Sequence, residues 1–207
     1  MSYLVDASAT HSEQWIHARR TVRPRHLHTP GPTNDQLARI LSAAAAAPDH
    51  GELRPWRFVL VPPAARTSLA DAFEQALIHR DTLAAASQRE QVREKAYYAP
   101  TLLLAVAQLS GATENGIPDH ERLVSAGCAI QNMLLVASAL GFGSALTSGR
   151  VMEAASLRRL FALQQCDRAL CFLSFGTPVR HRPPRQTPDL ATYFSVLEAP
   201  LPDGAGK

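Results

Sequence analysis

LVSAGCAIQNMLLVASALGFGSALTSG, residues 123–149, contains no charged side chain. A stretch of this length and composition is long enough to form a helix that spans a membrane. Gln131 lies in its middle, however, and Gly141 and Gly143 would end a helix before the stretch ends. We therefore expect a long helix at about residues 121–140, buried in the core of a soluble protein or in a dimer interface and not in a membrane.

Shorter apolar runs on both sides of this stretch predict strands. TLLLAVA at 101–107 and ALCFLSFG at 169–176 are continuous apolar runs, which need cover on both faces, and WRFVLV at 56–61 predicts a further strand. Capping boxes at Thr10-x-x-Glu13 and Thr33-x-x-Gln36 predict the starts of two helices. Further helices are predicted at about residues 66–80, 87–96 and 151–163. The pattern as a whole predicts an α+β fold.

We expect one domain that spans residues 1–207, because no linker or internal repeat divides the chain. Its tail, from about residue 177 to residue 207, is rich in proline and arginine and then contains an isolated LATYF segment. Such a segment predicts a C-terminal arm that adds to a neighbouring subunit.

Composition and charge argue against several classes of protein. The chain has 207 residues, a net charge of +3 and a pI near 9.0. A charge this small, with no aromatic residues among the clustered arginines, argues against nucleic-acid binding. Three cysteines without disulfide spacing and an N-terminus without a signal-peptide pattern predict a cytoplasmic protein.

Three arginines and a hydroxyl lie within five residues where the first predicted helix ends. They are Arg19, Arg20, Thr21 and Arg23, in the segment HARRTVRPR. Planar guanidinium groups at this density could form an anion site. They could equally be cations that complement the dipole at the C-terminal end of the helix. Spacing alone leaves both interpretations open.

The loop APDHGELRPW, residues 47–56, presents His50 and Arg54 between a helix and a strand. No partner at metal-ligand spacing lies nearby, so we expect no metal there. Surface hydrogen bonds are the simpler interpretation of such a pair. A third segment, GFGSALTSGR at 141–150, has glycines that would allow its backbone to approach a ligand closely.

The chain has no dinucleotide-binding fingerprint, phosphate-binding loop or nucleophile elbow, and no pair of carboxylates set in an apolar pocket. We therefore expect no catalytic side chain, and chemistry that is supplied by a cofactor.

Taken in order, these segments and the later FLSFGTP resemble the nitroreductase family of flavoproteins, especially its small single-domain bacterial members. The likeness covers about residues 12–195. It implies an α+β fold with a central, mostly antiparallel sheet flanked by helices. It also implies a homodimer that exchanges its C-terminal arms and binds two FMN molecules at the interface. The uncharged helix would be the seam of that dimer, with Ser125, Ala126, Gly127 and Ala129 allowing close approach.

The resemblance also implies roles for individual residues. Arg19, Arg20 and Thr21 match an Arg-Arg-Ser motif that grips the FMN phosphate and ribityl chain, and Arg23 matches a cation near the flavin pyrimidine. His50 and Arg54 match positions that reach a flavin bound mainly by the other subunit.

Two segments depart from the family pattern. Close relatives tend to have an amide-bearing residue in place of Arg54. The segment formed by Leu146, Thr147 and Ser148 replaces an aromatic residue and a cation, although its hydroxyls could still donate hydrogen bonds to flavin. Arg150, Arg182 or Arg185 would then supply the missing cation.

The implied activity is that of an FMN-dependent oxidoreductase. NADH or NADPH would donate hydride, and a nitroaromatic, quinone or similar conjugated small molecule would accept it in ping-pong turnover. A non-catalytic flavin-binding or regulatory module would share every cofactor residue and is the main alternative.

Overall fold

The computed structural model describes residues 11–110, 116–179 and 188–197. At its centre is a five-stranded sheet. The strands are β1 (Leu27–His28), β2 (Trp56–Leu60), β3 (Thr101–Gln108), β4 (Gly143–Thr147) and β5 (Asp167–Pro178). β5 lies in the middle, with β3 and then β2 on one side and with β4 and β1 paired to successive parts of its other edge. All these pairings are antiparallel, which confirms the predicted kind of sheet.

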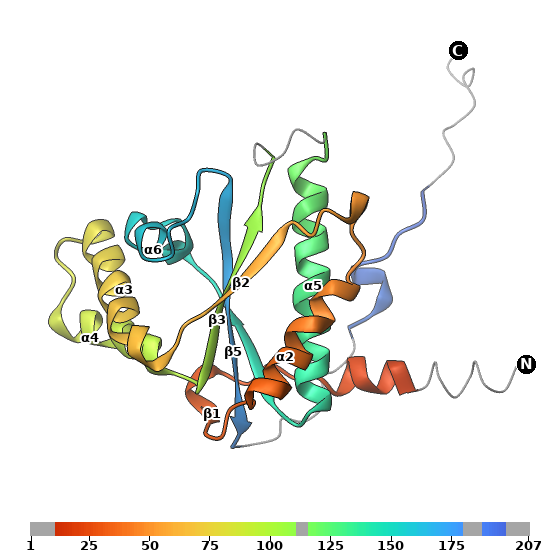
Figure 1. Cartoon of the computed structure of the whole chain (residues 1–207), viewed down its shortest axis with the longest axis horizontal. Helices are drawn as coiled ribbons and strands as arrows, with labels where there is room; N and C mark the ends of the chain where they lie inside the picture. Colours follow the sequence, from red (N-terminus) through yellow and green to blue (C-terminus); the bar gives the residue numbers. More distant parts are fainter. Residues whose placement is uncertain (1–10, 111–115, 180–187, 198–207) are drawn as a thin grey trace, which may run out of the picture.

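Helices cover both faces of the sheet, so the predicted α+β class is confirmed (Figure 1). One face carries α2 (Asn34–Ser42) and α5 (Asp119–Ala139). The other carries α3 (Arg66–Arg80) and α6 (Ala155–Leu160), with α4 (Ala86–Glu94) packed on α3. This cover explains why β3 and β5 are apolar on both faces.

Successive side chains of a strand point to opposite faces of the sheet, so they enter two separate cores. On β3, Leu103 packs with Met133 of α5, whereas the adjacent Leu104 packs with Leu69 of α3. Both leucines are almost completely buried. The sheet is therefore held between two apolar layers.

Several predicted boundaries differ from the observed ones. The Thr33 capping box is confirmed, since Gln36 N–H donates to Thr33 Oγ1 at 3.3 Å and Thr33 N–H donates to Gln36 Oε1 at 2.9 Å. The helix that starts there ends at Ser42 and is followed by a 3₁₀ turn at Ala43–Ala46. The helix predicted at 151–163 is a 3₁₀ turn, η6 (Arg150–Glu153), followed by α6. Thr10 lies outside the described residues.

α5 is the long helix predicted from the uncharged stretch. It is long and apolar enough by length and composition to cross a membrane, but its inner face is buried against the sheet. Gly141, at a φ of 85°, follows its C-terminus, and the Gly141 N–H donates to the Ser138 carbonyl at 3.0 Å.

Three of the four residues predicted for the dimer seam are buried within this chain. Ser125, Ala126 and Ala129 are buried against this chain's own sheet, because their helical spacing places them on the inner face of α5. They are therefore not available to another subunit. Gly127 is the exception, since it lies on the exposed face beside Val124, which is 65% exposed.

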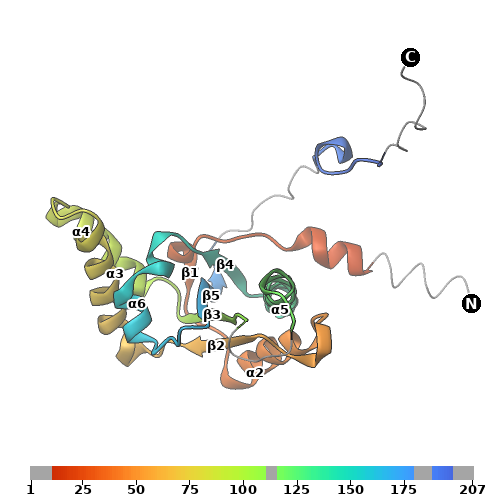
Figure 2. The ribbon, with the colours of Figure 1, turned by 90° about the horizontal axis from the view of Figure 1, so that it is seen from above.

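Both described ends of the chain lie away from the sheet (Figure 2). Residues 11–18 are helical, and residues 188–197 are exposed throughout. Each end carries large apolar side chains in solvent, among them Trp15, Phe194 and Leu197.

Candidate functional site

The arginine cluster, Arg19, Arg20, Thr21 and Arg23, follows helical residues 11–18 and lies along the edge of the sheet. Thr21 forms a parallel bridge with Ser144 of β4, and the Val22 N–H donates to the Ser144 carbonyl at 2.9 Å. The cluster therefore runs beside β4. Two segments that the sequence assigns to one site are brought together by this bridge.

The first two arginines of the cluster, Arg19 and Arg20, are half-buried and form no ion pair with any residue that the structure describes. The Nε atom of Arg20 is buried and has no hydrogen-bond partner within the described part of the chain. Burial, followed by the charge of Arg20, lowers the pKa of Arg19 below its usual value. An anion with several acceptor oxygens would relieve both effects. The geometry thus favours an anion site over simple dipole-complementing cations, and its donors fit a phosphate.

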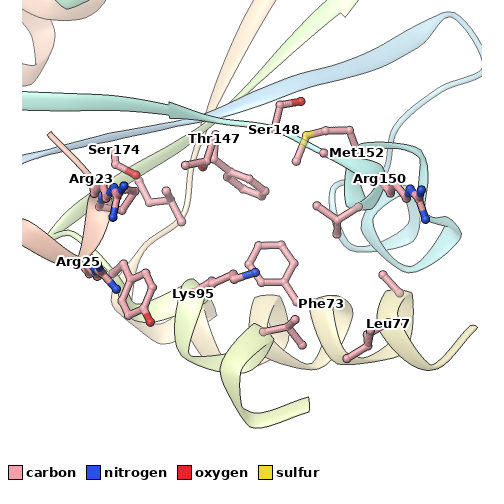
Figure 3. A pocket seen from close by; sticks show the side chains of 18 of the residues that line it. Arg23, Arg25, Phe73, Leu77, Lys95, Thr147, Ser148, Arg150, Met152 and Ser174 are labelled. Atoms are coloured by element: carbon pink, nitrogen blue, oxygen red, sulfur yellow. The ribbon is translucent and has the colours of Figure 1, made fainter. Parts of the chain in front are cut away.

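A cavity of about 470 Å³ opens between β4 and α3 (Figure 3). Three of the predicted cofactor residues line it, namely Arg23, Thr147 and Ser148. Leu146 does not, because successive strand residues face opposite sides of the sheet. The floor of the cavity is formed by side chains of β3 and β5, including Leu102 and Ser174.

The hydroxyl of Ser148 is already used within this chain, since its Oγ donates to the Leu170 carbonyl at 2.8 Å. In this arrangement the Ser148 hydroxyl cannot also donate to a cofactor, because a serine hydroxyl has a single proton to donate. Arg150, one candidate for the missing cation, lines the same cavity. The other two candidates, Arg182 and Arg185, lie outside the described residues.

The opposite wall of the cavity was missed by the sequence analysis. It comes from Phe73 and Leu77 of α3 and from Lys95 and Tyr98 at η5 (Lys95–Tyr97). Phe73 and Leu77 lie in the helix predicted at 66–80, and Lys95 and Tyr98 lie at or just after the end of the helix predicted at 87–96. Arg25 also lines the cavity, and its position two residues after Arg23 is the one signal that could have suggested it.

Tyr98, at this wall, interacts with the carboxylate of Glu94 and with the positive charge of Arg25. Burial raises the pKa of its hydroxyl above the usual value, and the charge of Glu94 and the 3.3 Å hydrogen bond to that carboxylate raise it further. The positive charge of Arg25 has the opposite effect. Tyr98 therefore stays protonated at neutral pH, and its hydroxyl donates to the Glu94 carboxylate.

His50 and Arg54 are not brought to this cavity by the fold of one chain. They lie in and after η3 (His50–Glu52), beside the N-terminal end of α5, on the face of the sheet opposite α3 (Figure 1). His50 Nδ1 lies 2.7 Å from Glu121 Oε2, and both His50 and Arg54 have exposed side chains. Within one chain they form a separate surface.

The backbone of this loop is in an uncommon conformation. Glu52 and Arg54 adopt left-handed φ values of 52° and 49° next to Gly51 at 69°. Residues other than glycine rarely adopt such values without support. Here the support comes from the Arg54 N–H, which donates to the carboxylate of Asp49. The loop thus holds His50 and Arg54 in a defined arrangement.

The three cysteines form no disulfide. All three are free, and burial raises the pKa of the Cys171 thiol to about 11. Among the described residues, no group of three or more His, Cys, Asp or Glu side chains could hold a metal ion.

Comparison with known proteins agrees with this geometry. The family model described as "Nitroreductase family" matches residues 16–177. The chain is 34% identical over 156 residues to "Putative NAD(P)H nitroreductase YdjA" of Escherichia coli K12, covering 73% of this chain and 81% of that protein. It is 31% identical over 153 residues to "Putative NAD(P)H nitroreductase" of Haemophilus influenzae, covering 74% and 82%.

Solved structures share the fold at low sequence identity. A nitroreductase-like family protein from Bacillus cereus superposes with a TM-score of 0.77 at 19% identity, covering 90% of this chain and 96% of that one. The FMN-dependent nitroreductase NfnB from Mycobacterium smegmatis, solved in complex with NADPH, gives a TM-score of 0.67 at 18% identity, covering 92% and 99%.

Proposed function

Because this chain belongs to the nitroreductase family, we propose that it passes hydride from NAD(P)H through FMN to a nitroaromatic, quinone or similar conjugated acceptor. It is an FMN-dependent NAD(P)H oxidoreductase. In the proposed ping-pong turnover, the donor leaves before the acceptor enters the same open position. We place the protein in the cytoplasm, where reducing conditions would keep its three cysteines as free thiols.

One observation carries the assignment of the cofactor site. The buried Nε of Arg20 has no hydrogen-bond partner among the described residues, and it lies beside a desolvated Arg19. A phosphate group would satisfy both guanidinium groups with charge-assisted hydrogen bonds. In this proposal Arg19 and Arg20 hold the FMN phosphate, and the exposed Thr21 hydroxyl binds the ribityl chain next to it.

When bound, FMN supplies the two-electron redox chemistry, so the protein has to supply binding, orientation and charge compensation. Arg23 presents a fixed cation at the cavity wall, where it would stabilise negative charge that develops on a reduced ring. Thr147 lines the same cavity and offers its hydroxyl. The apolar side chains of Phe73 on the wall and of Leu102 on the floor exclude water from the cavity.

The second half of the site would come from another copy of this chain. His50 and Arg54 are exposed and remote from the cavity of their own chain, which supports a homodimer in which they reach the partner's flavin. The exposed face of α5, with Val124 and Gly127, suits the interface. The apolar side chains of residues 188–197 suit an arm, within the proposed single domain, that covers the partner.

The absorbance spectrum of the purified protein tests the proposal. We expect a yellow protein with the two visible bands of flavin, a dimer by light scattering, and rapid bleaching by NADH or NADPH without oxygen. A conjugated acceptor should then restore the colour. Bound flavin that neither donor bleaches would instead identify a non-catalytic flavin-binding module.

A further inference from the structure

Arg66, the first residue of α3, is a buried cation without a counter-charge. It is only 5% exposed, and among the residues that the structure describes it forms no ion pair. Burial lowers the pKa of its guanidinium group. A cation at the N-terminal end of a helix is also unfavourable, because it opposes the helix dipole. Arg66 therefore does not favour α3 itself, and its role has to lie in what it contacts.

Each nitrogen of the Arg66 guanidinium donates to a backbone carbonyl of a different segment. Nε donates at 3.2 Å to Val61, directly after β2, and Nη1 donates at 2.8 Å to Ala96 in η5. Nη2 donates at 3.3 Å to Pro100, directly before β3. Arg66 thus joins the end of β2 and the start of β3 to the turn that follows α4.

The turn held by Arg66 contains a residue in an unfavourable conformation. Ala99 is buried and adopts a left-handed φ of 64°. Such values are uncommon for alanine and persist where the surrounding structure imposes them. The carbonyls of Ala96 and Pro100, which accept from the two Nη atoms, lie on either side of Ala99 in the chain. The guanidinium group therefore bridges the turn and holds it in this shape.

The same turn carries two side chains of the cavity that the proposed function assigns to the flavin ring. Lys95 and Tyr98 line this cavity, and the ammonium group of Lys95 is directed into it (Figure 3). Lys95 directly precedes Ala96, so a change in the turn would move its side chain. The preceding helix gives little support, because no residue of α4 is fully buried. The position of the Lys95 cation therefore depends on the contacts of Arg66.

We propose that Arg66 is a positioning residue of the flavin site, which holds the turn at residues 96–100 so that the Lys95 cation faces the ring. Arg66 itself does not line the cavity and acts through Lys95. A fixed cation stabilises the negative charge of a reduced ring, so its position affects how readily the flavin is reduced. The inference rests on the proposed function, because it requires FMN in this cavity.

The reduction potential of bound FMN, measured by stepwise chemical reduction with a reference dye, tests this without turnover of NAD(P)H. In Arg66→Met, the preference for reduced over oxidised FMN should fall about tenfold, which lowers the potential of a two-electron couple by about 30 mV. Lys95→Gln should have a similar effect. The double variant should show no further shift, because both substitutions remove the same cation from the ring. Fully additive shifts, or an unchanged potential in Arg66→Met, would overturn the proposal.

Arg158→Met is the matched control. Arg158 of α6 is half-buried and does not line the cavity. It also donates to three backbone carbonyls, those of Leu163, Gln164 and Asp167. Its loss should lower the Tm as the loss of Arg66 does, but should leave the potential of FMN unchanged. An equal shift of the potential in this control would show that general destabilisation is the cause and would overturn the proposal.

Two further substitutions separate the shape of the turn from the charge of Arg66. Ala99→Gly should restore part of the potential in Arg66→Met, because glycine adopts a left-handed φ without a steric penalty. Arg66→Lys keeps the charge but loses the planar group that reaches three carbonyls, so it should shift the potential in the same direction by a smaller amount. This variant also provides the test if Arg66→Met does not fold, and a potential equal to that of the wild type would then count against the proposal.

Digestion of the apoprotein by a lysine-specific protease gives a readout that needs no flavin. Lys95 and Lys207 are the only lysines of the chain, so the protease has one internal site, directly before the buried Ala96. We expect cleavage about tenfold faster in Arg66→Met than in the wild type or in Arg158→Met, because loss of the bridge opens the turn. If no FMN binds, the proposed function fails, and faster cleavage still shows that Arg66 holds the turn. Equal cleavage of all three proteins would overturn the inference even in a fully active enzyme.

Discussion

Glu121 Oε2 lies 2.7 Å from His50 Nδ1 and so joins the η3 loop to the first turn of α5. His50 has an exposed side chain, and Glu121 is partly exposed. A pair of this kind contributes little to stability, but it fixes the orientation of the imidazole ring. If His50 reaches the flavin of the partner subunit, Glu121 acts as a positioning residue for it.

We expect Glu121→Ala to weaken FMN binding about threefold to tenfold and to lower the Tm of the apoprotein by no more than about 3 °C. The FMN affinity of Glu121→Gln should lie between those of the wild type and Glu121→Ala, because the amide oxygen of the glutamine can still accept a hydrogen bond from His50. Flavin fluorescence measures the affinity, and Glu90→Gln on the exposed side of α4 is the control. Unchanged FMN affinity in Glu121→Ala would show that His50 does not contact the flavin.

Arg20→Met should leave the apoprotein at least as stable as the wild type but should weaken FMN binding. It removes a buried Nε that has no partner in the described part of the chain, and it removes a charge that acts on Arg19. The apoprotein should therefore be as stable as the wild type or more stable by about 1 kcal/mol. FMN affinity should fall about tenfold to a hundredfold through loss of a charge-assisted contact. Thermal unfolding with and without FMN measures both, with Arg159→Met as the control. Equal destabilisation of both forms would mean that Arg20 has a structural role only.

Gly127→Ala distinguishes an isolated chain from a dimer. A Cβ at Gly127 would meet nothing within 4 Å in this chain, and alanine favours a helix by about 1 kcal/mol. The substitution should therefore stabilise the single chain. If α5 packs closely on the partner, it should instead weaken association, which analytical ultracentrifugation measures as a higher dissociation constant. A variant that is more stable and equally dimeric would place the interface elsewhere.

The buried Cys171 thiol makes stability depend on alkaline pH. Burial raises its pKa from 9.0 to about 11 in the folded protein. The stabilisation from the neutral thiol is therefore fully present below about pH 9 and is lost as the pH rises towards 11. We expect the wild type to lose about 2 kcal/mol more than Cys171→Ala across this range, measured by urea unfolding. Parallel pH profiles for the two proteins would contradict this.

The sequence predicted the parts of the fold that local patterns determine. β3 and β5 were visible as continuous apolar runs, and α5 as a long uncharged stretch. β1 was not, because Leu27 and His28 become a strand only by pairing with residues 177–178 of β5. β4 also lacked a signal, since its residues have no apolar alternation. A Cβ at Gly143 would lie 2.7 Å from Leu27 Cδ2, so the close packing of β4 on Leu27 leaves no room for a side chain at this position.

The candidate site, too, was only partly predictable from the sequence. Arg19, Arg20 and Arg23 were recognisable because they are dense in sequence, and the structure supports an anion site there. The wall carrying Lys95 and Tyr98 was not predictable, because only the packing of α3 and α4 across the sheet brings it opposite β4. The placement of His50 and Arg54 at a flavin remains a prediction, since it depends on a second chain.

The bridge between Thr21 and Ser144 has a consequence for how the protein matures. The two residues are far apart in sequence, and the bridge is what holds the arginine cluster against β4. During synthesis the N-terminal arginines leave the ribosome long before β4 exists, so they cannot yet form a phosphate-binding surface. Flavin capture therefore has to follow completion of the sheet, and a nascent chain that ends before Ser144 should emerge colourless.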